Sequence, residues 1–186
     1  MPYLGPDFFM RDTISVARDL IGVTLVAGKC EGRIVETEAY TTDPASHAVT
    51  RPRQAAAMRD TYGHVYVYLI YGIYYCLNFT TEIEGVGAVL VRAVEPVRGI
   101  EIMKRRRKTG DIRRLTTGPG RLCEAFGIDL SFNGKVVGSR LLLRSRTGSP
   151  AIESSSRIGI TQGLDFEWRF YQRDNPFVSG PRKRSA

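Results

Sequence analysis

The chain has 186 residues, of which 42% are hydrophobic and 25% charged, as in an ordinary globular protein. Lysine and arginine outnumber aspartate and glutamate by 27 to 19, and this net charge of +8 favours a polyanionic partner, either nucleic acid or an anionic membrane surface. The sequence has neither an apolar run that could span a bilayer nor a recognisable signal peptide, so we expect a cytoplasmic protein. The length predicts a single domain over residues 1–186.

The three cysteines exclude two common uses of this residue. Cys30, Cys76 and Cys123 are odd in number and widely spaced, and no CxxC pair occurs. This spacing indicates neither a disulfide framework nor a zinc site. We expect reduced, buried thiols and no bound metal.

The first elements predict a helix packed on a sheet. Thr13 is a suitable helix cap, and the apolar residues that follow have helical spacing: Ile14, Ala17, Leu20 and Ile21. A short strand is expected at Val23–Ala27.

The next strand, Arg33–Tyr40, carries unusual side chains. Because alternate side chains share a face, Ile34, Glu36, Glu38 and Tyr40 are expected on the same side. A carboxylate beside an aromatic ring at a strand end suits general-base chemistry on a flat, ring-bearing substrate. The alternative is a solvated strand face with two ordinary surface glutamates.

Residues 41–63 are mostly polar and predict a long loop, with one helical turn at 54–58. The loop carries His47, one of only two histidines in the chain. A lone loop histidine is more often a surface residue than a catalytic one.

Two aromatic, β-branched runs, at 64–70 and 73–80, predict a hairpin whose turn is Tyr71-Gly72. Turn tips favour small polar residues, so a tyrosine there is either folded back on the sheet or exposed for a function. Tyr71 is the aromatic that the turn directs away from the core.

An apolar strand is predicted at 86–94, interrupted by Arg92. A buried arginine needs a partner, and Glu38 or Glu36 on a neighbouring strand is the candidate. A helix is expected from Pro96 into the basic run at 104–108.

The basic run is the best candidate for phosphate contacts. Residues 98–114 contain eight lysines or arginines and two acidic residues, which is +6 of the net charge. A solvated helix end, where basic residues suit the helix dipole, is the alternative reading. The candidates are Lys104, Arg105 and Arg107.

The remaining chain predicts a helix that starts at Pro119 and stops at Gly127. Strand-like runs occur at 141–143, 157–161 and 168–171, a Ser- and Gly-rich loop at 145–156, and a basic tail at 181–184.

Taken together, these motifs resemble those of the methylpurine (alkyladenine, 3-methyladenine) DNA glycosylase family. The matching stretches keep their order along the chain: RIVETEAY (33–40), YVYLIYG (66–72) with Cys76 and Asn78, VRAVEP (91–96), GPGRLC (118–123), RIGI (157–160), RFY (169–171) and NPFVS (175–179). The stretch that follows Arg53-Gln54 departs from the family pattern, with one extra residue and no proline before the hairpin.

The resemblance implies a mixed α/β fold: one compact domain with a curved, mainly antiparallel sheet, flanking helices and a protruding hairpin that inserts into DNA. It implies a monomeric, monofunctional hydrolase of base-excision repair that acts on duplex DNA containing damaged purines. Such an enzyme flips an alkylated or deaminated purine, hydrolyses its N-glycosidic bond and leaves an abasic site. Neither a cofactor, a metal nor abasic-site lyase activity is implied.

The resemblance also implies roles for individual residues. Glu38 matches the general base that activates water, and Arg92 matches the arginine that holds it. The residues that match the lesion pocket are Tyr40, His47, Tyr68 and Asn78, the last of which excludes the amino group of guanine. Tyr71 matches the aromatic that fills the gap in the duplex, and the backbone of Ile158 is expected to face the water.

Two alternatives from other classes remain at this point. A metal-dependent nuclease would use Glu36, Glu38 and His47 as ligands, although a two-metal site normally needs more carboxylates. A non-catalytic nucleic-acid-binding module would need none of them.

Overall fold

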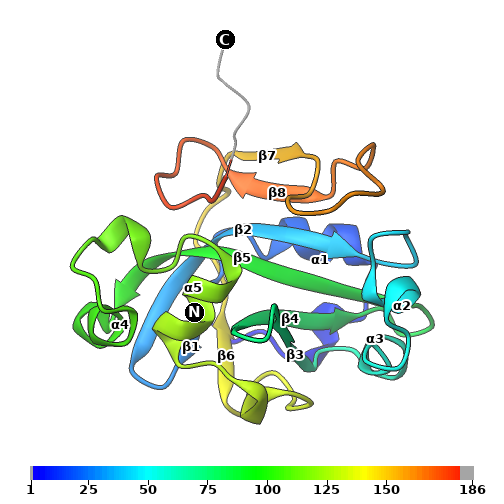
Figure 1. Cartoon of the computed structure of the whole chain (residues 1–186), viewed down its shortest axis with the longest axis horizontal. Coiled ribbons are helices and arrows are strands. Elements are labelled where there is room, and N and C mark those ends of the chain that lie inside the picture. The colour runs from blue at the N-terminus through cyan, green and yellow to red at the C-terminus, as the bar shows by residue number, and fades with distance from the viewer. Residues whose placement is uncertain (1, 181–186) are drawn as a thin grey trace.

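The computed structural model describes residues 2–180, whose strands form one eight-stranded curled sheet (Figure 1). The strands are β1 (Thr24–Ala27), β2 (Cys30–Tyr40), β3 (Val65–Ile70), β4 (Tyr74–Thr81), β5 (Gly87–Arg98), β6 (Leu141–Arg144), β7 (Ile152–Ser155) and β8 (Arg169–Gln172). The main order is β3-β4-β5-β2-β1-β6, and β8 pairs with both β2 and β7. Every pairing of named strands is antiparallel, so the predicted mixed α/β fold with a curved antiparallel sheet is confirmed.

Strand β2 is the centre of this arrangement because it has a different neighbour at each end. It pairs with β5 over most of its length, with β1 at residues 30–33 and with β8 at residues 36–38. The two short partners occupy the same side of β2 in succession. The second half of β2 is therefore held between β5 and β8, and this half carries Glu36 and Glu38.

A β-bulge in β2 changes which residues share a face. Ile34 pairs with Val94 and Glu36 pairs with the next residue, Ala93, so Val35 is an extra residue in β2. Ile34 joins the main core, and Val35 joins a separate cluster with Ala93. The expectation that Ile34 and Glu36 share a face is therefore wrong, because strict alternation fails at a bulge.

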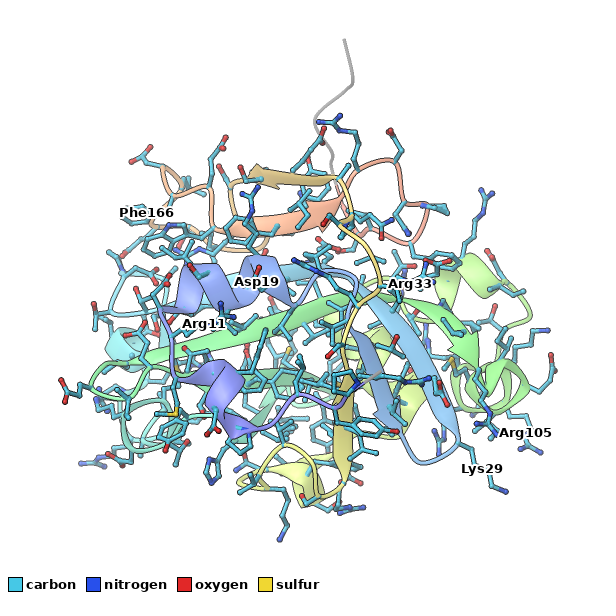
Figure 2. The ribbon with its side chains drawn as sticks, turned by 180° about the vertical axis from the view of Figure 1, so that it is seen from behind. Arg11, Asp19, Lys29, Arg33, Arg105 and Phe166 are labelled. Atoms are coloured by element: carbon cyan, nitrogen blue, oxygen red, sulfur yellow. The ribbon has the colours of Figure 1, made fainter. Side chains whose placement is uncertain are left out.

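The described helices are α1 (Thr13–Asp19), α2 (His47–Thr50), α3 (Ala57–Asp60), α4 (Ile100–Arg107) and α5 (Pro119–Phe126), with 3-10 turns η1 (Pro6–Phe9), η2 (Ile112–Arg114) and η3 (Leu130–Phe132). Helix α1 lies on the side of β2 and β5 that Figure 2 shows, whereas α5 packs on β4 and β5 from the opposite side. The predicted helix from Pro119 to Gly127 is confirmed, with Gly127 ending it at a φ of 69°.

The apolar residues of α1 and α5 meet those of the sheet in one main core. Thr37 lies on the core side of β2 and its hydroxyl donates to the carbonyl of Ala17 on α1. All three cysteines are free and buried, as expected.

The helix expected from Pro96 is wrong, because β5 continues to Arg98 and α4 starts only at Ile100. Strand β4 accompanies β5 only over residues 87–90, so Pro96 is paired on one side alone, with Gly32. A proline, which lacks an N–H, is tolerated at such an edge. Gly99, with a φ of 79°, makes the turn into the helix.

The strand expected at 157–161 is also wrong. Residues 152–155, within the region read as a loop, form β7 against β8 instead. Residues 157–163 lie outside every named strand. The predicted basic tail at 181–184 falls outside the described residues.

Candidate active site

Glu38 lies in the second half of β2 and its side chain is completely buried. Its Oε2 accepts hydrogen bonds from the Tyr40 hydroxyl at 2.8 Å and from Arg92 Nη1 at 3.2 Å. Its Oε1 accepts the backbone N–H of Ile158 at 2.7 Å. All three partners donate, which suits an ionised carboxylate that can act only as an acceptor. The reading of Glu36 and Glu38 as wet surface residues is wrong, because both are buried.

A second carboxylate continues the ion network away from Glu38. Arg92 Nε donates to Glu36 Oε1 at 3.3 Å, and Arg169 Nε donates to the same oxygen at 2.7 Å. Glu36 Oε2 accepts the backbone N–H of Ser179 at 2.6 Å. Two carboxylates and two guanidinium groups thus balance one another in a site that solvent hardly reaches. The prediction that Arg92 pairs with Glu38 or Glu36 is confirmed, and Arg92 pairs with both.

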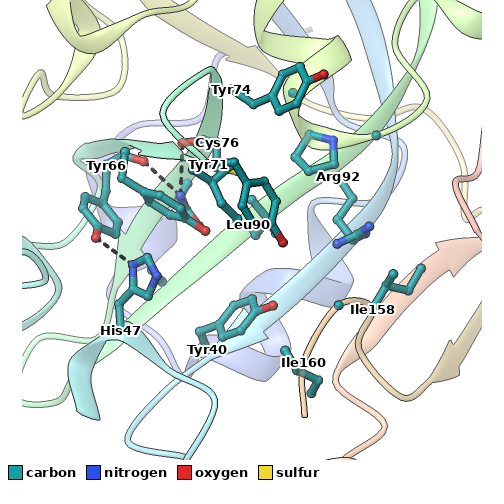
Figure 3. A pocket seen from close by; sticks show the side chains of 18 of the residues that line it. Tyr40, His47, Tyr66, Tyr71, Tyr74, Cys76, Leu90, Arg92, Ile158 and Ile160 are labelled. Atoms are coloured by element: carbon teal, nitrogen blue, oxygen red, sulfur yellow. Dashed lines mark hydrogen bonds between the residues drawn. The ribbon is translucent and has the colours of Figure 1, made fainter. Parts of the chain in front are cut away.

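A cavity of about 650 Å³ opens beside this network (Figure 3). Its wall is formed by the second half of β2, the β3–β4 hairpin, β5, the start of α5 and the loop at 158–160. Glu38 does not line the cavity itself, but its three partners Tyr40, Arg92 and Ile158 all do. The carboxylate therefore lies one layer behind the cavity surface, at the side where Figure 3 shows Arg92 and Ile158.

Aromatic side chains surround the opposite part of the cavity. The rings of His47 and Tyr68 lie 4.4 Å apart, and those of Tyr66 and Tyr68 lie 5.4 Å apart. His47 Nδ1 is 3.1 Å from the Tyr66 hydroxyl, and Figure 3 marks this contact. His47 is thus a cavity residue rather than an ordinary surface histidine, despite the unusual loop that carries it.

Burial shifts the titration of this aromatic group. It raises the pKa of Tyr66 to about 12. Burial and the adjacent Glu38 carboxylate raise the pKa of Tyr40 well above its usual value, and burial and Cys76 raise that of Tyr68. Burial, with a contribution from Arg51, lowers the pKa of His47, which favours the neutral form of this side chain.

Asn78 lies on β4, lines the cavity and is 3% exposed. Its Nδ2 donates to the carbonyls of Tyr66 at 3.1 Å and Cys76 at 3.3 Å. Both bonds fix the amide rigidly, so that it can act as a steric and polar limit to the cavity.

The β3–β4 hairpin forms the rim above these residues. The N–H of Ile73 donates to the carbonyl of Ile70, so Tyr71 and Gly72 are the two central turn residues, with φ of 54° and 71°. Tyr71 is 83% exposed, and the neighbouring Ile73 and Tyr74 are also exposed. The hairpin is confirmed, and Tyr71 holds a left-handed conformation that is unfavourable for a residue with a Cβ.

A buried ion pair supports the loop that carries Ile158. Both Arg157 and Asp43 are almost fully buried, and Arg157 Nη2 donates to Asp43 Oδ1 at 2.6 Å. Burial acts to raise the pKa of Asp43, but hydrogen bonds from Arg157 and from the backbone of Thr41 and Ala45 outweigh it, and the pKa lies below its usual value.

Comparison with known proteins gives a consistent result. The family model described as methylpurine-DNA glycosylase matches residues 7–176. A relative from Agrobacterium fabrum is 44% identical over 182 residues, covering 96% of this chain and 93% of its own length. A relative from Salinibacter ruber is 44% identical, and the match covers 96% of this chain and 97% of the relative. One from Rhodopseudomonas palustris is 42% identical, and the match covers 98% of this chain and 93% of the relative. All three are provisionally named 3-methyladenine DNA glycosylase.

The chain belongs to the methylpurine-DNA glycosylase family. Membership makes it a DNA glycosylase, a hydrolase of DNA repair whose substrate is DNA. Most of the motifs that suggested this family contribute residues to the cavity wall, whereas RFY (169–171) and NPFVS (175–179) do not line it. Within residues 2–180, no group of three or more His, Cys, Asp or Glu side chains is arranged to hold a metal ion. No helix in this part of the chain is long and apolar enough to cross a membrane.

The cavity of this glycosylase contains most of the sequence-predicted residues but not all of them. Those that line it are Tyr40, His47, Tyr68, Tyr71, Asn78, Arg92 and Arg107. Lys104 and Arg105 lie elsewhere on α4. Arg105 projects near Lys29 at the edge of the view from behind (Figure 2), and Lys104 pairs with Glu101. Arg107 bonds to Glu124 and to the carbonyl of Leu115, so its charge is largely engaged.

Sequence reasoning missed two ion pairs that support the site, Arg169–Glu36 and Arg157–Asp43. The motifs RFY and RIGI contain these arginines, and an arginine within a strand-like apolar run was the available signal. The rule that a buried arginine needs a carboxylate applies to both, but it does not identify which carboxylate is the partner.

Proposed function

We propose that this chain is a base-excision repair glycosylase that flips a damaged purine out of duplex DNA and hydrolyses its N-glycosidic bond. The observation that carries the proposal is Glu38, a buried carboxylate held by three donors directly behind an aromatic cavity. A carboxylate so held is suited to take a proton from a water molecule at the cavity wall. The names of the relatives favour alkylated purines such as 3-methyladenine as substrates.

The cavity suits a flipped purine in its size and lining. The rings of Tyr40, Tyr68 and His47 offer stacking surfaces, which are worth roughly 1–3 kcal/mol per base in related single-strand sites. An alkylated purine carries positive charge and should stack well on electron-rich tyrosine rings. Asn78, fixed by its two carbonyl partners, would exclude the exocyclic amino group of an undamaged guanine.

The chemical step needs stabilisation of a sugar with oxocarbenium character. Glu38 supplies negative charge behind the cavity wall and accepts the proton of the attacking water, whose oxygen bonds to C1′ as the C1′–N bond breaks. Arg92, which donates to both Glu36 and Glu38, holds the carboxylate in this orientation. A cationic purine leaves without an acid, whereas a neutral purine such as hypoxanthine needs a hydrogen bond at its edge, for which His47 is available.

Extrusion of the base leaves a gap in the duplex, at a cost of about a few kcal/mol for unstacking. We propose that Tyr71, exposed at the hairpin tip, enters this gap from the minor groove. The basic side chains of α4, with Arg105 the most available, supply phosphate contacts. One chain contributes every residue of this machinery, so we propose that it acts as a monomer.

We also propose that the enzyme is monofunctional. A lyase reaction requires an amine nucleophile that forms a Schiff base with the sugar. Among the described residues that line the cavity there is no lysine. The expected product is therefore an intact strand with an abasic site.

The decisive experiment replaces Glu38 with glutamine and measures base release from a duplex with one lesion under single-turnover conditions. General-base catalysis contributes about 10²–10⁴-fold, and we expect a loss in this range with unchanged lesion binding, because the amide is nearly isosteric but cannot take the proton. Glu153→Gln is the matched control, since Glu153 lies on β7 and pairs with Arg173 rather than with the cavity. Near-normal turnover in Glu38→Gln would refute the assignment.

The same assay separates the other two candidate functions. Both oxygens of Glu36 and of Glu38 already accept hydrogen bonds, from guanidinium groups, backbone N–H groups and the Tyr40 hydroxyl, so a metal ion would have to displace these donors. Release of free base in the presence of EDTA contradicts a metal-dependent nuclease. Turnover of any kind contradicts a binding module without activity.

A further inference from the structure

The residue before Ile158 is anchored far more firmly than the loop around it. Arg157 is 3% exposed, and its Nη1 donates to the carbonyl of Ala39 at 2.9 Å and to Asp43 Oδ2 at 3.1 Å. Its Nη2 donates to Asp43 Oδ1 at 2.6 Å. One guanidinium group therefore ties the loop to the end of β2 and to the segment that follows β2.

The loop itself offers little regular support for the position of Ile158. Residues 157–163 belong to no named strand, and two glycines within them, Gly159 and Gly163, have φ of 77° and 66°. Glycines with positive φ allow many backbone conformations when nothing else restricts them. The Arg157 side chain supplies that restriction one residue before the N–H that donates to Glu38.

Asp43 extends the same support toward the lesion-binding side of the cavity. Its carboxylate accepts the N–H groups of Thr41 and Ala45, and its backbone carbonyl accepts the N–H of Ser46. Ser46 in turn caps α2, the helix that begins at His47. The position of His47 thus depends on a turn built around Asp43.

The guanidinium group of Arg157 also contacts two aromatic rings. Its centre lies 4.7 Å from the ring of Tyr40 and 5.2 Å from that of Trp168. Tyr40 both lines the cavity and donates to Glu38. Arg157 therefore constrains two of the three groups that hold Glu38, one by chain connectivity and the other by stacking.

We propose that the Arg157–Asp43 ion pair positions the two halves of the active site, fixing the Ile158 N–H on Glu38 and the turn that presents His47. Neither residue touches the reacting atoms, so both are positioning residues. A fully buried ion pair is weak evidence for stability alone, because apolar residues of similar volume often serve as well. The bidentate geometry matters for orientation instead. This inference rests on the proposed role of Glu38 as the base.

The test uses Arg157→Lys and Asp43→Asn, with Arg173→Lys as a control that alters an ion pair, Arg173–Glu153, outside the cavity. Lysine keeps the buried positive charge but cannot make the planar, bidentate contact. Asparagine at position 43 removes the negative charge of the pair, and Arg157 keeps its hydrogen bond to the carbonyl of Ala39. Each protein is studied below its own melting temperature, with native secondary structure checked by circular dichroism.

The direct measurement is hydrogen exchange of the Ile158 amide by NMR in the absence of DNA. Loss of the anchor frees the loop, and we expect exchange at least about tenfold faster in both variants, but not in Arg173→Lys. Base release under single-turnover conditions should fall about 10–100-fold, since misplaced groups cost this much, whereas affinity for undamaged duplex should not change. Asp43→Asn should in addition weaken binding of hypoxanthine duplex, because the His47 turn is affected.

Wild-type exchange of Ile158 and wild-type base release in either folded variant would overturn the proposal. So would faster exchange in both variants with no change in base release. These outcomes differ from a failure of the proposed function, in which the wild-type protein releases no base or Glu38→Gln remains fully active. If the proposed function fails in this way, the hydrogen-exchange measurement at Ile158 still tests the anchor, because it requires neither DNA nor enzymatic activity.

Discussion

The surroundings of Glu38 and the tip of the β3–β4 hairpin are opposites in physical terms. Glu38 is completely buried, and each of its oxygens has a donor within 3.2 Å. Tyr71 at the tip is 83% exposed and holds a φ of 54°. Burial with full hydrogen bonding makes the first region rigid before any substrate arrives. The second is an apolar side chain in an unfavourable backbone conformation, whose contacts must come from a partner.

The difference teaches how the two tasks are separated in one small chain. Chemistry needs groups that are fixed in advance, because reorganisation during the reaction costs rate. Insertion into a duplex needs a side chain that is free until DNA is present. Mutations in the first region should therefore change both stability and rate, and mutations in the second should change rate alone.

Removal of Arg92 gives the largest expected effect. In Arg92→Leu, Glu36 and Glu38 lose a shared cationic partner in a buried site, and such losses cost about 3–5 kcal/mol. We expect urea denaturation to show a decrease in unfolding free energy of this order, together with loss of base release. Arg33→Leu, at an exposed pair with Glu95, is the control and should change stability little. A stable Arg92→Leu protein with normal turnover would contradict the comparison.

Replacement of Tyr71 by serine should leave the unfolding free energy nearly unchanged, since the ring is exposed. Activity on a duplex lesion should fall about 10–100-fold, because stacking of roughly 1–3 kcal/mol is no longer available to fill the gap. A lesion in an unpaired bulge should suffer much less.

Fluorescence of 2-aminopurine beside the lesion reports the flip directly in this variant. If Tyr71→Ser equals wild type in both fluorescence and duplex rate, the hairpin is scaffold only. Ile83→Ser provides a control, because Ile83 is also exposed but does not line the cavity.

The basic residues of α4 allow a finer distinction between free and engaged charges. Arg105→Gln should reduce the slope of log affinity against log salt by roughly 0.9 if it removes one phosphate contact. Arg107→Gln should reduce the slope less but lower stability, since Arg107 bonds to Glu124 and Leu115. Lesion and undamaged DNA should be affected equally. Equal slopes for Arg105→Gln and wild type would show that this part of α4 faces away from DNA.

The smallest effect concerns the pH dependence of stability through His47. Burial first, and Arg51 second, lower the pKa of this histidine in the folded protein. The unfolded chain therefore binds a proton more readily, and stability falls as the pH drops below about 6.5 until the folded histidine also titrates. Thermal melts at pH 7 and pH 5 should show a smaller loss for His47→Gln than for wild type. Parallel losses in the two proteins would contradict this origin.

The sequence predicted the hairpin, the α5 helix and the partner of Arg92 because each depends on a local rule. Gly72 marks a turn, Pro119 and Gly127 bound a helix, and a buried arginine requires a carboxylate. The errors occurred where the identity of the neighbouring strand decides. Pro96 is compatible with β5 because the pairing of β5 with β4 stops at Leu90, before the strand reaches the proline.

The site was recovered less completely than the fold, for a similar reason. Residues of the aromatic cavity lie in segments with recognisable motifs, whereas its supports join distant segments. Asp43 and Arg157 are 114 positions apart, and neither residue alone indicates the other. The bulge at Val35 and Glu36 depends on the partner strand, and no alternation pattern within β2 reveals it.

The burial of the three thiols has a consequence for the conditions in which such an enzyme works. Burial raises the pKa of Cys30 and Cys123, and it raises that of Cys76 to about 11. Electrophiles attack thiolates, and at neutral pH these cysteines present almost none. Methylating agents that convert purines into the proposed substrates are themselves electrophiles. The three thiols are therefore poor targets for such agents, and we expect alkylation of these cysteines to contribute little to any loss of repair activity.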